Sequence, residues 1–324
     1  MEAVLRVDMK GIGAIVVTYN SEAEIGPCLD AALRHTERVV VVDNASSDGT
    51  LREVRKRPGV SLISNAENRG FAAAANQGMQ ALDVPFLLLL NPDAVLETGV
   101  EPLAEACGQT GVGASAGKLV DAQGEPQSGF SVRRLPTPAA LAFEVLGLNR
   151  IWRRNPVNRR YRCLDFDLDA PADVEQPAGA FLMIRRDVWQ ALGGFDEQFR
   201  PVWFEDVDLL KRLRDAGYRV RYVPSAVARH LGGHAVGKVT EFSRAEWWYG
   251  SLLRYSFKHF QAWGRLVVWK AVVVGCGFRM VYAVLREWKL APLAVYCRVI
   301  RLACVRLRAG RYGEAGETPV LARQ

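Results

Sequence analysis

Two groups of carboxylates in this sequence have the residue types and spacing to do chemistry. Asn91-Pro92-Asp93 follows four consecutive leucines, and Trp203-Phe204-Glu205-Asp206-Val207-Asp208 places three acidic side chains beside two aromatic ones. A hard divalent cation needs only one or two protein carboxylates when phosphate oxygens and water complete its shell. Asp93 is therefore suited to a metal ion that holds a diphosphate. In the second group, an aromatic face suits a sugar, and an adjacent carboxylate suits a base that takes a hydroxyl proton.

Both groups also have a structural explanation. An Asn-Pro-Asp turn is ordinary loop chemistry, and acidic residues are favoured at a helix N-terminus. Three carboxylates beside two aromatics exceed what a helix start requires, so we favour the chemical interpretation of residues 203–208. His230 could add a metal or phosphate ligand, although a lone histidine is more often structural. Asp165-Phe-Asp167-Leu-Asp169 has similar spacing, but the alternation of Asp with apolar residues predicts a half-exposed strand.

The elements that position these residues follow from hydrophobic periodicity. Apolar, β-branched runs alternate with segments of helical spacing, and such alternation predicts an α/β fold with a parallel sheet covered on both faces. Ligands of such sheets bind beyond the carboxyl ends of the strands. We expect strands at 13–18, 38–43, 60–64 and 85–90 and helices at 22–35, 50–56 and 70–82. The polar segments at the strand ends are Thr18-Tyr-Asn20, Asp43-Asn44, Asn68-Arg-Gly70 and Asn91-Pro-Asp93.

Asp43 is the strongest candidate for binding a nucleoside. At a strand end, its carboxylate can accept a hydrogen bond from the imide N–H of a pyrimidine or from ribose hydroxyls, with Thr18 and Asn20 at the neighbouring strand end. The alternative, that Asp43-Asn44 only caps a turn, stays open at this point. Gly11-Ile-Gly13 precedes its strand, whereas a dinucleotide fingerprint must follow one, and the sequence has no P-loop.

The second half of the chain is less regular. For residues 115–177 we expect β-strands and a long variable loop that includes the basic stretch 150–162. Beyond it the pattern predicts a strand at 179–185, helices at 186–192 and 206–216, and a strand at 218–223. Gly217 ends the second of these helices.

The C-terminal region is strongly basic. Residues 242–312 contain thirteen Lys or Arg against two Glu, a local charge of +11 in a chain of formal charge +7. Such a region meets an anionic surface, either phospholipid or nucleic acid. Residues 266–285 are as long as a membrane span, but Lys270 and Arg279 interrupt them, and a central charge costs about 2.5–3.5 kcal/mol. We therefore expect an amphipathic helix lying on a membrane, or else a helical extension that packs on the rest of the chain or pairs with another subunit.

Composition excludes several classes of protein. With 324 residues and 49% hydrophobic content, the chain can bury one large core or two ordinary ones, so global disorder is excluded. Six cysteines lie far apart without a C-x-x-C pair, which fits neither a disulfide framework nor a zinc site, and we expect reduced, mostly buried thiols. The first residues lack the apolar core of an export signal, so a cytoplasmic location is expected.

Seven segments in register resemble the inverting glycosyltransferases of family 2, and within them the rhamnosyltransferase-like branch. The resemblance covers about residues 12–235, and it implies a GT-A fold, a Rossmann-like, mostly parallel sheet flanked by helices. The segments are Ile15-Val-Val-Thr-Tyr-Asn20, Val40-Val-Val-Asp-Asn-Ala-Ser-Ser-Asp-Gly-Thr50, Asn68-Arg-Gly-Phe-Ala-Ala-Ala-Ala-Asn76, Leu90-Asn-Pro-Asp93, Gly179-Ala-Phe-Leu-Met-Ile-Arg185, Gly193-Gly-Phe-Asp-Glu197 and Phe204-Glu-Asp-Val-Asp208.

The resemblance implies a role for each candidate residue. Asp206 is the general base with Glu205 in support, and Asp93 is the metal-binding position of a D-x-D motif that here reads Asn-Pro-Asp. His230 matches a histidine usually followed by Gly-Gly and a hydroxyl residue, whereas this chain has His234 and no hydroxyl. The implied cofactor is Mg²⁺ or Mn²⁺. The implied nucleotide-binding residues are Thr18, Asn20, Asp43, Asn68, Gly70 and Asn91, and the acceptor or sugar residues are Trp203, Gly179 and Ala180.

The resemblance also implies an organisation and an activity. We expect a GT-A catalytic domain at 1–240, with a nucleotide-sugar half at about 12–115 and an acceptor half at about 116–240. A basic, membrane-associating helical region at 241–312 and a flexible tail at 313–324 follow. The expected reaction is metal-dependent, inverting transfer of L-rhamnose from dTDP-rhamnose to a polyprenyl-diphosphate-linked saccharide in cell-envelope polysaccharide synthesis.

The resemblance also implies binding partners, and two alternative functions stay open. The partners are the nucleotide sugar, the lipid-linked acceptor and the anionic inner face of the cell membrane, with no nucleic acid, and the C-terminal helices could pair two copies. One alternative keeps the fold with a UDP-hexose or UDP-galactofuranose donor. Another is a non-catalytic nucleotide-sugar-binding or membrane-scaffold protein.

Overall fold

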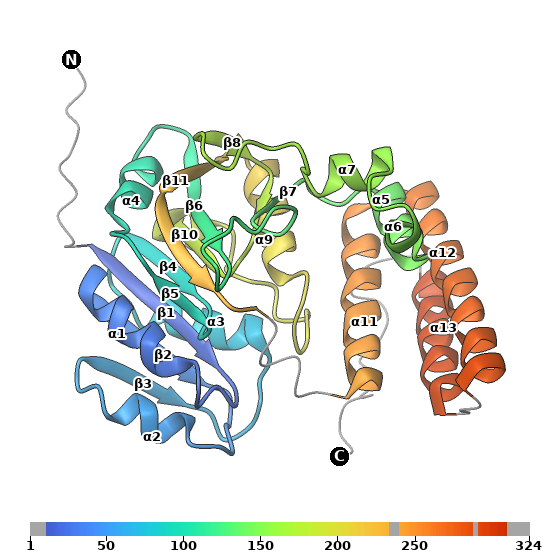
Figure 1. The fold of residues 1–324 in the computed structure, drawn as a ribbon, viewed down its shortest axis with the longest axis horizontal. Coiled ribbons are helices and arrows are strands. Elements are labelled where there is room, and N and C mark those ends of the chain that lie inside the picture. Colours follow the sequence, from blue (N-terminus) through green and yellow to red (C-terminus); the bar gives the residue numbers. More distant parts are fainter. Residues whose placement is uncertain (1–10, 233–239, 288–290, 310–324) are drawn as a thin grey trace. The chain divides into compact units, whose positions relative to one another are not determined.

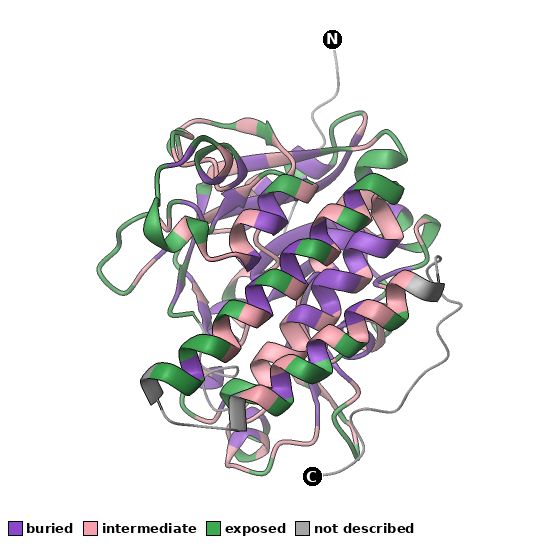
Figure 2. Ribbon diagram, turned by 90° about the vertical axis from the view of Figure 1, so that its right-hand side faces the viewer, coloured by how far each residue is buried: buried purple, intermediate pink, exposed green. Residues whose placement is uncertain are grey.

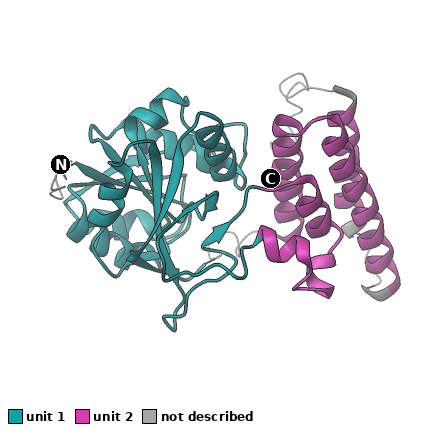
Figure 3. Cartoon of the chain, turned by 90° about the horizontal axis from the view of Figure 1, so that it is seen from above, with its two compact units in different colours: residues 1–135, 162–238 teal, residues 136–161, 239–324 magenta. Residues whose placement is uncertain are grey.

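The computed structural model describes residues 11–232, 240–287 and 291–309, which form two compact units (Figures 1 and 3). Unit 1 lies within residues 1–135 and 162–238, and unit 2 within 136–161 and 239–324. Residues 136–161, which we expected within the domain 1–240, thus group with the C-terminal helices. The first ten residues, His234 and the tail at 313–324 lie outside the described residues.

Unit 1 is built on a mixed sheet with the strand order β3-β2-β1-β4-β10-β6-β11-β5, and β8 pairs with β11. The segment β3-β2-β1-β4 is parallel, as the alternation of strands and helices predicts. Beyond it, β10 runs antiparallel to both β4 and β6. The strands are β1 (Ile12–Thr18), β2 (Arg38–Asp43), β3 (Val60–Ser64), β4 (Phe86–Leu90), β5 (Ala94–Leu96), β6 (Val112–Val120), β8 (Ala172–Val174), β10 (Phe181–Arg185) and β11 (Arg219–His230).

Helices cover both faces of this sheet (Figure 1). Alternate residues of β1 enter different cores, Ala14 and Val16 on one face and Ile15 and Val17 on the other, because successive side chains of a strand point to opposite sides. Helices α1, α2 and α4 pack on the first face, and α3, α8 and α9 on the second. Their bounds are α1 (Ile25–His35), α2 (Thr50–Arg55), α3 (Phe71–Gln80), α4 (Glu101–Cys107), α8 (Arg186–Ala191) and α9 (Glu205–Asp215).

The strand register brings the candidate residues to one edge of the sheet. Thr18 is the register partner of Asp43, and Asp43 is in turn the partner of Ser64. Leu90 lies opposite Val16, so the turn that begins at Asn91 leaves the sheet beside the same edge. The polar segments identified from the sequence therefore share one rim.

The middle of the chain differs from expectation. It holds strands, including a separate two-stranded sheet of β7 (Val132–Arg133) and β9 (Gln176–Pro177), but also three helices. The expected strand at 165–169 is wrong, because these residues form turns in which Asp167 and Asp169 are exposed and Asp169 pairs with Lys118. The helices are α5 (Pro138–Val145), α6 (Leu148–Ile151) and α7 (Pro156–Tyr161).

Unit 2 combines these three helices with the C-terminal ones. Helix α12 packs against α5 and α13, while α11 packs against α12 and α13. Arg279 of α12 is turned into the unit, where its guanidinium donates to the carbonyl oxygen of Val145 at 2.7 Å. The helical expectation for this region thus agrees with α11 (Glu241–His259), α12 (Ala262–Tyr282), the π-helix η1 (Ala283–Glu287) and α13 (Ala291–Ala309).

Helix α12 has two different faces, and Figure 2 shows buried and exposed residues alternating along the helices of this unit. Its buried face includes Val268 and Val272. In the described part of the chain, Ala262–Leu285 is the one helical stretch long and apolar enough to cross a membrane, judged by length and composition alone. Its exposed apolar side chains are Trp263, Leu266, Val274, Phe278, Val281, Tyr282, Val284 and Leu285.

Candidate active site

Thr18 and Asp43 form a buried polar pair at the sheet edge. Asp43 is fully buried, and one of its oxygens, Oδ2, accepts from the backbone N–H of Ser46 at 3.0 Å. Its other oxygen and the Thr18 hydroxyl have no hydrogen-bond partner among the described residues. Buried polar atoms without a partner cost about 1–3 kcal/mol each. A donor and an acceptor left open side by side are what a hydrogen-bonding ligand requires.

The other candidate nucleotide residues shape the loops around Asp43. Asn20, in a left-handed conformation, receives the N–H of Ser47 on its side-chain oxygen at 2.8 Å. Asn68 accepts from the N–H of Gly70 at 2.9 Å. Gly70 has a φ of 84°, and a Cβ there would lie 3.2 Å from the carbonyl oxygen of Pro201. These hydrogen bonds and this close approach fix the rim in place.

Asp93 and His230 form a second buried pair. His230 Nε2 lies 3.4 Å from Asp93 Oδ1, and both side chains are almost fully buried. They meet because β11 ends at His230 and pairs there with Ala94 of β5. Burial acts to raise the pKa of Asp93, but the hydrogen bond and charge of His230 and the N–H groups of Asp93 and Gly232 outweigh it, so this pKa lies below its usual range. Asp93 is thus held ionised, as a metal ligand must be.

This pair fits a divalent cation whose shell is completed by a diphosphate. Across the described residues no group of three or more His, Cys, Asp or Glu side chains could hold a metal by itself. A carboxylate and an imidazole nitrogen, side by side, nevertheless suffice for an ion that keeps water and phosphate ligands. The donor set favours an ion that binds together with the substrate.

Asp206 lies in the first turn of helix α9, and both of its carboxylate oxygens accept hydrogen bonds. Oδ1 accepts from the N–H of Val207 at 2.8 Å, and Oδ2 accepts from the N–H of Gly179 at 3.2 Å. Burial raises the pKa of Asp206, and the two N–H groups and the charge of Arg133 only partly offset this effect. A carboxylate with a raised pKa and fixed geometry is suited to accept a proton.

The neighbouring acidic residues have different environments. Glu205 is buried, its Oε2 has no hydrogen-bond partner in the described chain, and burial followed by the charge of Asp206 raises its pKa well above the usual range. Asp208 is fully buried and pairs at 2.8 Å with Arg212. Arg212 also donates to two carbonyl groups of the preceding loop. Asp208 therefore holds the helix in place. In the part of the chain that the structure describes, neither Glu205 nor Asp206 has an arginine partner, and both keep raised pKa values.

Two strained residues lead into this helix. Trp203 and Phe204 both have positive φ, 79° and 68°, a conformation that costs about 1–3 kcal/mol per residue away from glycine. Phe204 is buried and Trp203 is half-buried. Such a strained backbone conformation persists only where the surrounding contacts enforce it. Here it forms a sharp turn, and Glu205 and Asp206 follow this turn directly.

One backbone hydrogen bond joins the two carboxylate groups. The N–H of Asn91 donates to the carbonyl oxygen of Ala180 at 3.0 Å, continuing the pairing of β4 with β10. Gly179, which holds Asp206, is the residue before Ala180. The structure thus brings together Asp93 and Asp206, which lie more than one hundred residues apart in the sequence.

Sequence reasoning missed three residues beside His230. The His230 ring stacks on Phe130, with centroids 5.3 Å apart and planes 11° apart, and its Nδ1 lies 3.3 Å from Gln127 Oε1. The guanidinium carbon of Arg133 lies 5.6 Å from the centroid of Phe130. An aromatic residue close to two arginines, Gly129-Phe-Ser-Val-Arg-Arg134, was the available signal, but nothing in it specifies a neighbour one hundred residues away.

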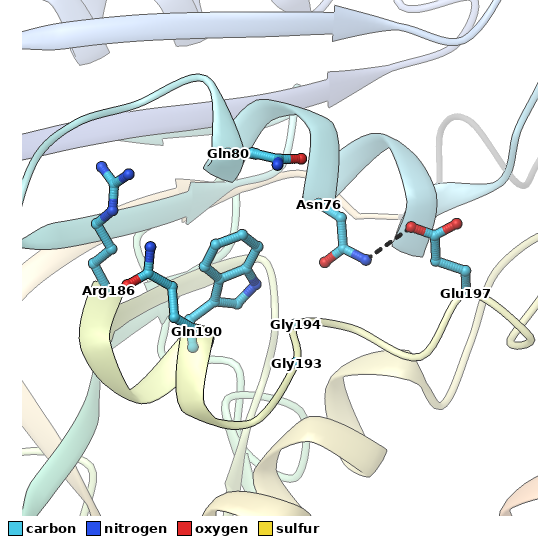
Figure 4. A pocket seen from close by; sticks show the side chains of 8 residues that line it. Asn76, Gln80, Arg186, Gln190, Gly193, Gly194 and Glu197 are labelled. Carbon is cyan, nitrogen blue, oxygen red and sulfur yellow. Dashed lines mark hydrogen bonds between the residues drawn. The ribbon is translucent and has the colours of Figure 1, made fainter.

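A pocket of about 350 Å³ lies apart from these residues (Figure 4). It lies between α3 and α8, and Asn76 donates to Glu197 across it at 3.0 Å. Arg186 lines it and bonds through its N–H to Pro85, just before β4 begins. The pocket therefore faces away from the strand ends that carry Asp43 and Asp93.

Comparison with known proteins agrees with this geometry. Residues 14–187 match the model of glycosyl transferase family 2, and residues 163–304 match glycosyl transferase family group 2. N-acetylglucosaminyl-diphospho-decaprenol L-rhamnosyltransferase of Mycobacterium tuberculosis is 30% identical over 69% of this chain and 77% of its own. The rhamnosyltransferase WbbL of Escherichia coli is 25% identical over 74% and 90%.

A solved structure shows the same fold. The mannosyltransferase PcManGT from Pyrobaculum calidifontis, in complex with GDP-Man and Mn²⁺, matches with a TM-score of 0.52 at 19% identity over 93% of this chain and 85% of its own. Together, the fold and the rim of carboxylates define a GT-A glycosyltransferase. The chain belongs to glycosyl transferase family 2, with rhamnosyltransferases among its relatives, and it transfers sugars.

Gly179 gives a direct test of how Asp206 is held. A Cβ at Gly179 would lie 3.0 Å from Asp206 Oδ2 and 3.1 Å from Asp206 Cβ, so Gly179→Ala should displace the carboxylate. Because a 1 Å misplacement can cost on the order of 100-fold in rate, we expect kcat to fall roughly 10- to 100-fold, measured by sugar transfer. Gly108→Ala, whose Cβ would lie at least 3.4 Å from any neighbour, is the matched control. Equal activity of the two variants would contradict this positioning role.

Proposed function

We propose that this enzyme transfers L-rhamnose from dTDP-rhamnose to a polyprenyl-diphosphate-linked saccharide in cell-envelope polysaccharide synthesis, with inversion at the anomeric carbon. The observation that carries the proposal is Asp206, a half-buried carboxylate with a raised pKa, held by Gly179 on the same rim as Asp93 and His230. The names of the mycobacterial and Escherichia coli relatives support the sugar, and the mycobacterial name supports the lipid-linked acceptor.

Asp206 acts as the general base in a single displacement. The acceptor hydroxyl gives its proton to the Asp206 carboxylate while its oxygen forms a bond to the anomeric carbon. The bond from that carbon to the donor diphosphate breaks, and the nucleoside diphosphate leaves with the electron pair. The new bond forms opposite the one that breaks, so the configuration inverts. The N–H groups of Gly179 and Val207 hold the base in line for this step.

Asp93 and His230 would hold a Mg²⁺ or Mn²⁺ ion at the diphosphate end of the donor. The bound ion supplies charge neutralisation for the departing diphosphate. The imidazole of His230 is kept in place by the Phe130 ring and Gln127. At the other end of the donor, Asp43 Oδ1 accepts from the pyrimidine imide and the Thr18 hydroxyl donates to a neighbouring oxygen or nitrogen, which gives both buried atoms partners.

Donor identity is tested by a screen of dTDP-rhamnose, UDP-hexoses and UDP-galactofuranose. We expect saturation-transfer NMR to show the strongest binding for dTDP-rhamnose, and Mn²⁺ to strengthen it because Asp93 and His230 then contact the diphosphate through the ion. Asp93→Asn should abolish the effect of Mn²⁺ and leave pyrimidine contacts detectable. Preference for a UDP-sugar would favour the alternative donor on the same fold.

Asp206 is tested by substitution and by pH. Asp206→Asn should lower kcat by about 10²–10⁴-fold, the usual contribution of a general base, with donor affinity largely kept. Because the pKa of Asp206 is raised and the ionised form is the active one, wild-type activity should fall with decreasing pH at a pH above the ordinary aspartate range. Asp215→Asn, at the exposed end of the same helix, should leave both rate and pH profile unchanged. Near-normal turnover in Asp206→Asn would exclude it as the base.

We further propose that unit 2 binds the cytoplasmic face of the membrane, where a lipid-linked acceptor resides. The exposed side chains of α12 form an apolar stripe, Trp263, Leu266, Val274, Phe278 and Val281, with only Lys270 of the same row charged. A helix with one face packed against α5 and α13 and the other apolar and exposed suits the interface plane. The basic residues of the region attract anionic lipid.

Vesicle flotation tests this surface. Phe278→Glu combined with Val281→Glu should lower binding to vesicles with about one-third anionic lipid at least 10-fold, since a buried large apolar side chain contributes about 1.5–3 kcal/mol. Gln80→Glu combined with Gln190→Glu adds the same charge at exposed positions of unit 1 and should float like wild type. If the α12 variant floats equally well, α12 is not the membrane-binding face.

A further inference from the structure

Arg133 has no assigned role, yet its guanidinium is held in a defined place and its charge acts on the candidate base. Its Nε donates to the carbonyl oxygen of Gly129 at 2.9 Å, and its guanidinium carbon lies 5.6 Å from the Phe130 ring centroid. The face of an aromatic ring attracts a cation, which helps to fix the guanidinium. Arg133 is half-buried, and no salt bridge connects it to a described carboxylate. Its two terminal nitrogens therefore keep their hydrogen-bonding capacity for a ligand.

The backbone places Arg133 on the Asp206 side of the site. In the small sheet, Arg133 of β7 lies opposite Gln176 of β9. The chain runs from β9 directly into Ala178, whose N–H donates to Ser131 at 3.0 Å, and then into Gly179, which holds Asp206. The segment that carries Arg133 is thus hydrogen-bonded to the segment that holds the base.

Charge distinguishes this position from the diphosphate end of the donor. The positive charge of Arg133 acts on Asp206 and lowers its pKa against the effect of burial, whereas the cationic partner of Asp93 is His230. The Phe130 ring, stacked on His230, also carries Arg133. One aromatic side chain, Phe130, thereby contacts both His230, the neighbour of Asp93, and Arg133, whose charge acts on Asp206.

We propose that Arg133 binds the phosphate oxygens of a diphosphate-linked acceptor, with its fork of N–H groups, and so positions the acceptor hydroxyl at Asp206. This role rests on the proposed function, because it requires an acceptor with phosphate near the reacting sugar. A planar guanidinium matches phosphate oxygens with two parallel hydrogen bonds. Because the guanidinium is positive, it adds no negative charge near Asp206. It also compensates the negative charge of the acceptor phosphates.

The test compares two acceptors that carry the same sugar, one linked to a short polyprenyl diphosphate and one a phosphate-free alkyl glycoside. Arg133→Ala should raise KM for the diphosphate acceptor roughly 10- to 100-fold, as expected for hydrogen bonds to a charged group. It should change KM for the alkyl glycoside less than about 3-fold and leave the Kd of the nucleotide sugar, measured by calorimetry, unchanged. For the diphosphate acceptor, the KM of Arg133→Lys, which keeps the charge but loses the fork, should lie between the values of the wild type and of Arg133→Ala.

Arg134→Ala is the matched control. Arg134 is the next residue along an extended segment, so it points to the opposite side, and its charge acts on Cys163 and Glu175 instead. This variant should behave like wild type with both acceptors.

The outcomes separate this role from the proposed function. If wild type prefers the diphosphate acceptor but Arg133→Ala loses activity equally with both acceptors, or loses donor affinity instead, Arg133 does not bind the acceptor phosphate. An unchanged KM for the diphosphate acceptor in Arg133→Ala gives the same conclusion. If wild type prefers the phosphate-free acceptor, the proposed acceptor class fails, and the role of Arg133 fails with it.

Discussion

The antiparallel pairing of β10 with β4 is the constraint on which the rest of the site depends. The parallel strands β3-β2-β1-β4 bring Thr18, Asp43 and the turn at Asn91 to one edge by register alone. A further parallel strand would have carried its following residues to that same edge. Because β10 runs the other way, the residues that enter it, Gly179 and Ala180, lie at this edge. The reversal is what places Asp206 beside the end of β4.

Burying carboxylates costs free energy in this arrangement. The groups that offset this cost differ from one carboxylate to the next. Asp93 is stabilised as an anion by His230 and backbone N–H groups, so its pKa falls. Asp206 has two N–H donors and the charge of Arg133, but its pKa remains above the ordinary aspartate value. Glu205, buried without a partner for Oε2 in the described chain, is shifted upward further. Similar side chains thus obtain different protonation behaviour from environment alone, which a metal ligand and a base require.

The strands and helices of residues 11–90 could be predicted because their signals are local, whereas the short strand β5 was not predicted. Four apolar strands, three helices and the helix at α9 follow from periodicity and turn residues, and the polar strand ends identify the rim. The helices α5 to α7 were not predicted, because they are short, turn residues such as Gly147, Asn155 and Pro156 separate them, and the packing of α5 with α7 and with α12 is long-range. The predicted strand at 165–169 was wrong because exposed and half-buried residues alternate in these turns as they would in a strand.

The candidate site was predictable in its carboxylates and not in its supporting residues. Asp93 and Asp206 lie in sequence motifs that can be recognised. Phe130 and Arg133 can be linked to the site only in the folded chain, where β7 pairs with β9 and β11 ends at His230. These contacts are long-range, and they act on the carboxylates through charge and orientation. A nearby cation lowers the pKa of a general base, and an ion pair would occupy its carboxylate. The base must nevertheless stay able to accept a proton while the cation binds phosphate. In the mechanism that we propose, holding Arg133 on an aromatic ring, without a salt bridge to Asp206, lets the guanidinium bind a phosphate while Asp206 stays able to accept the proton.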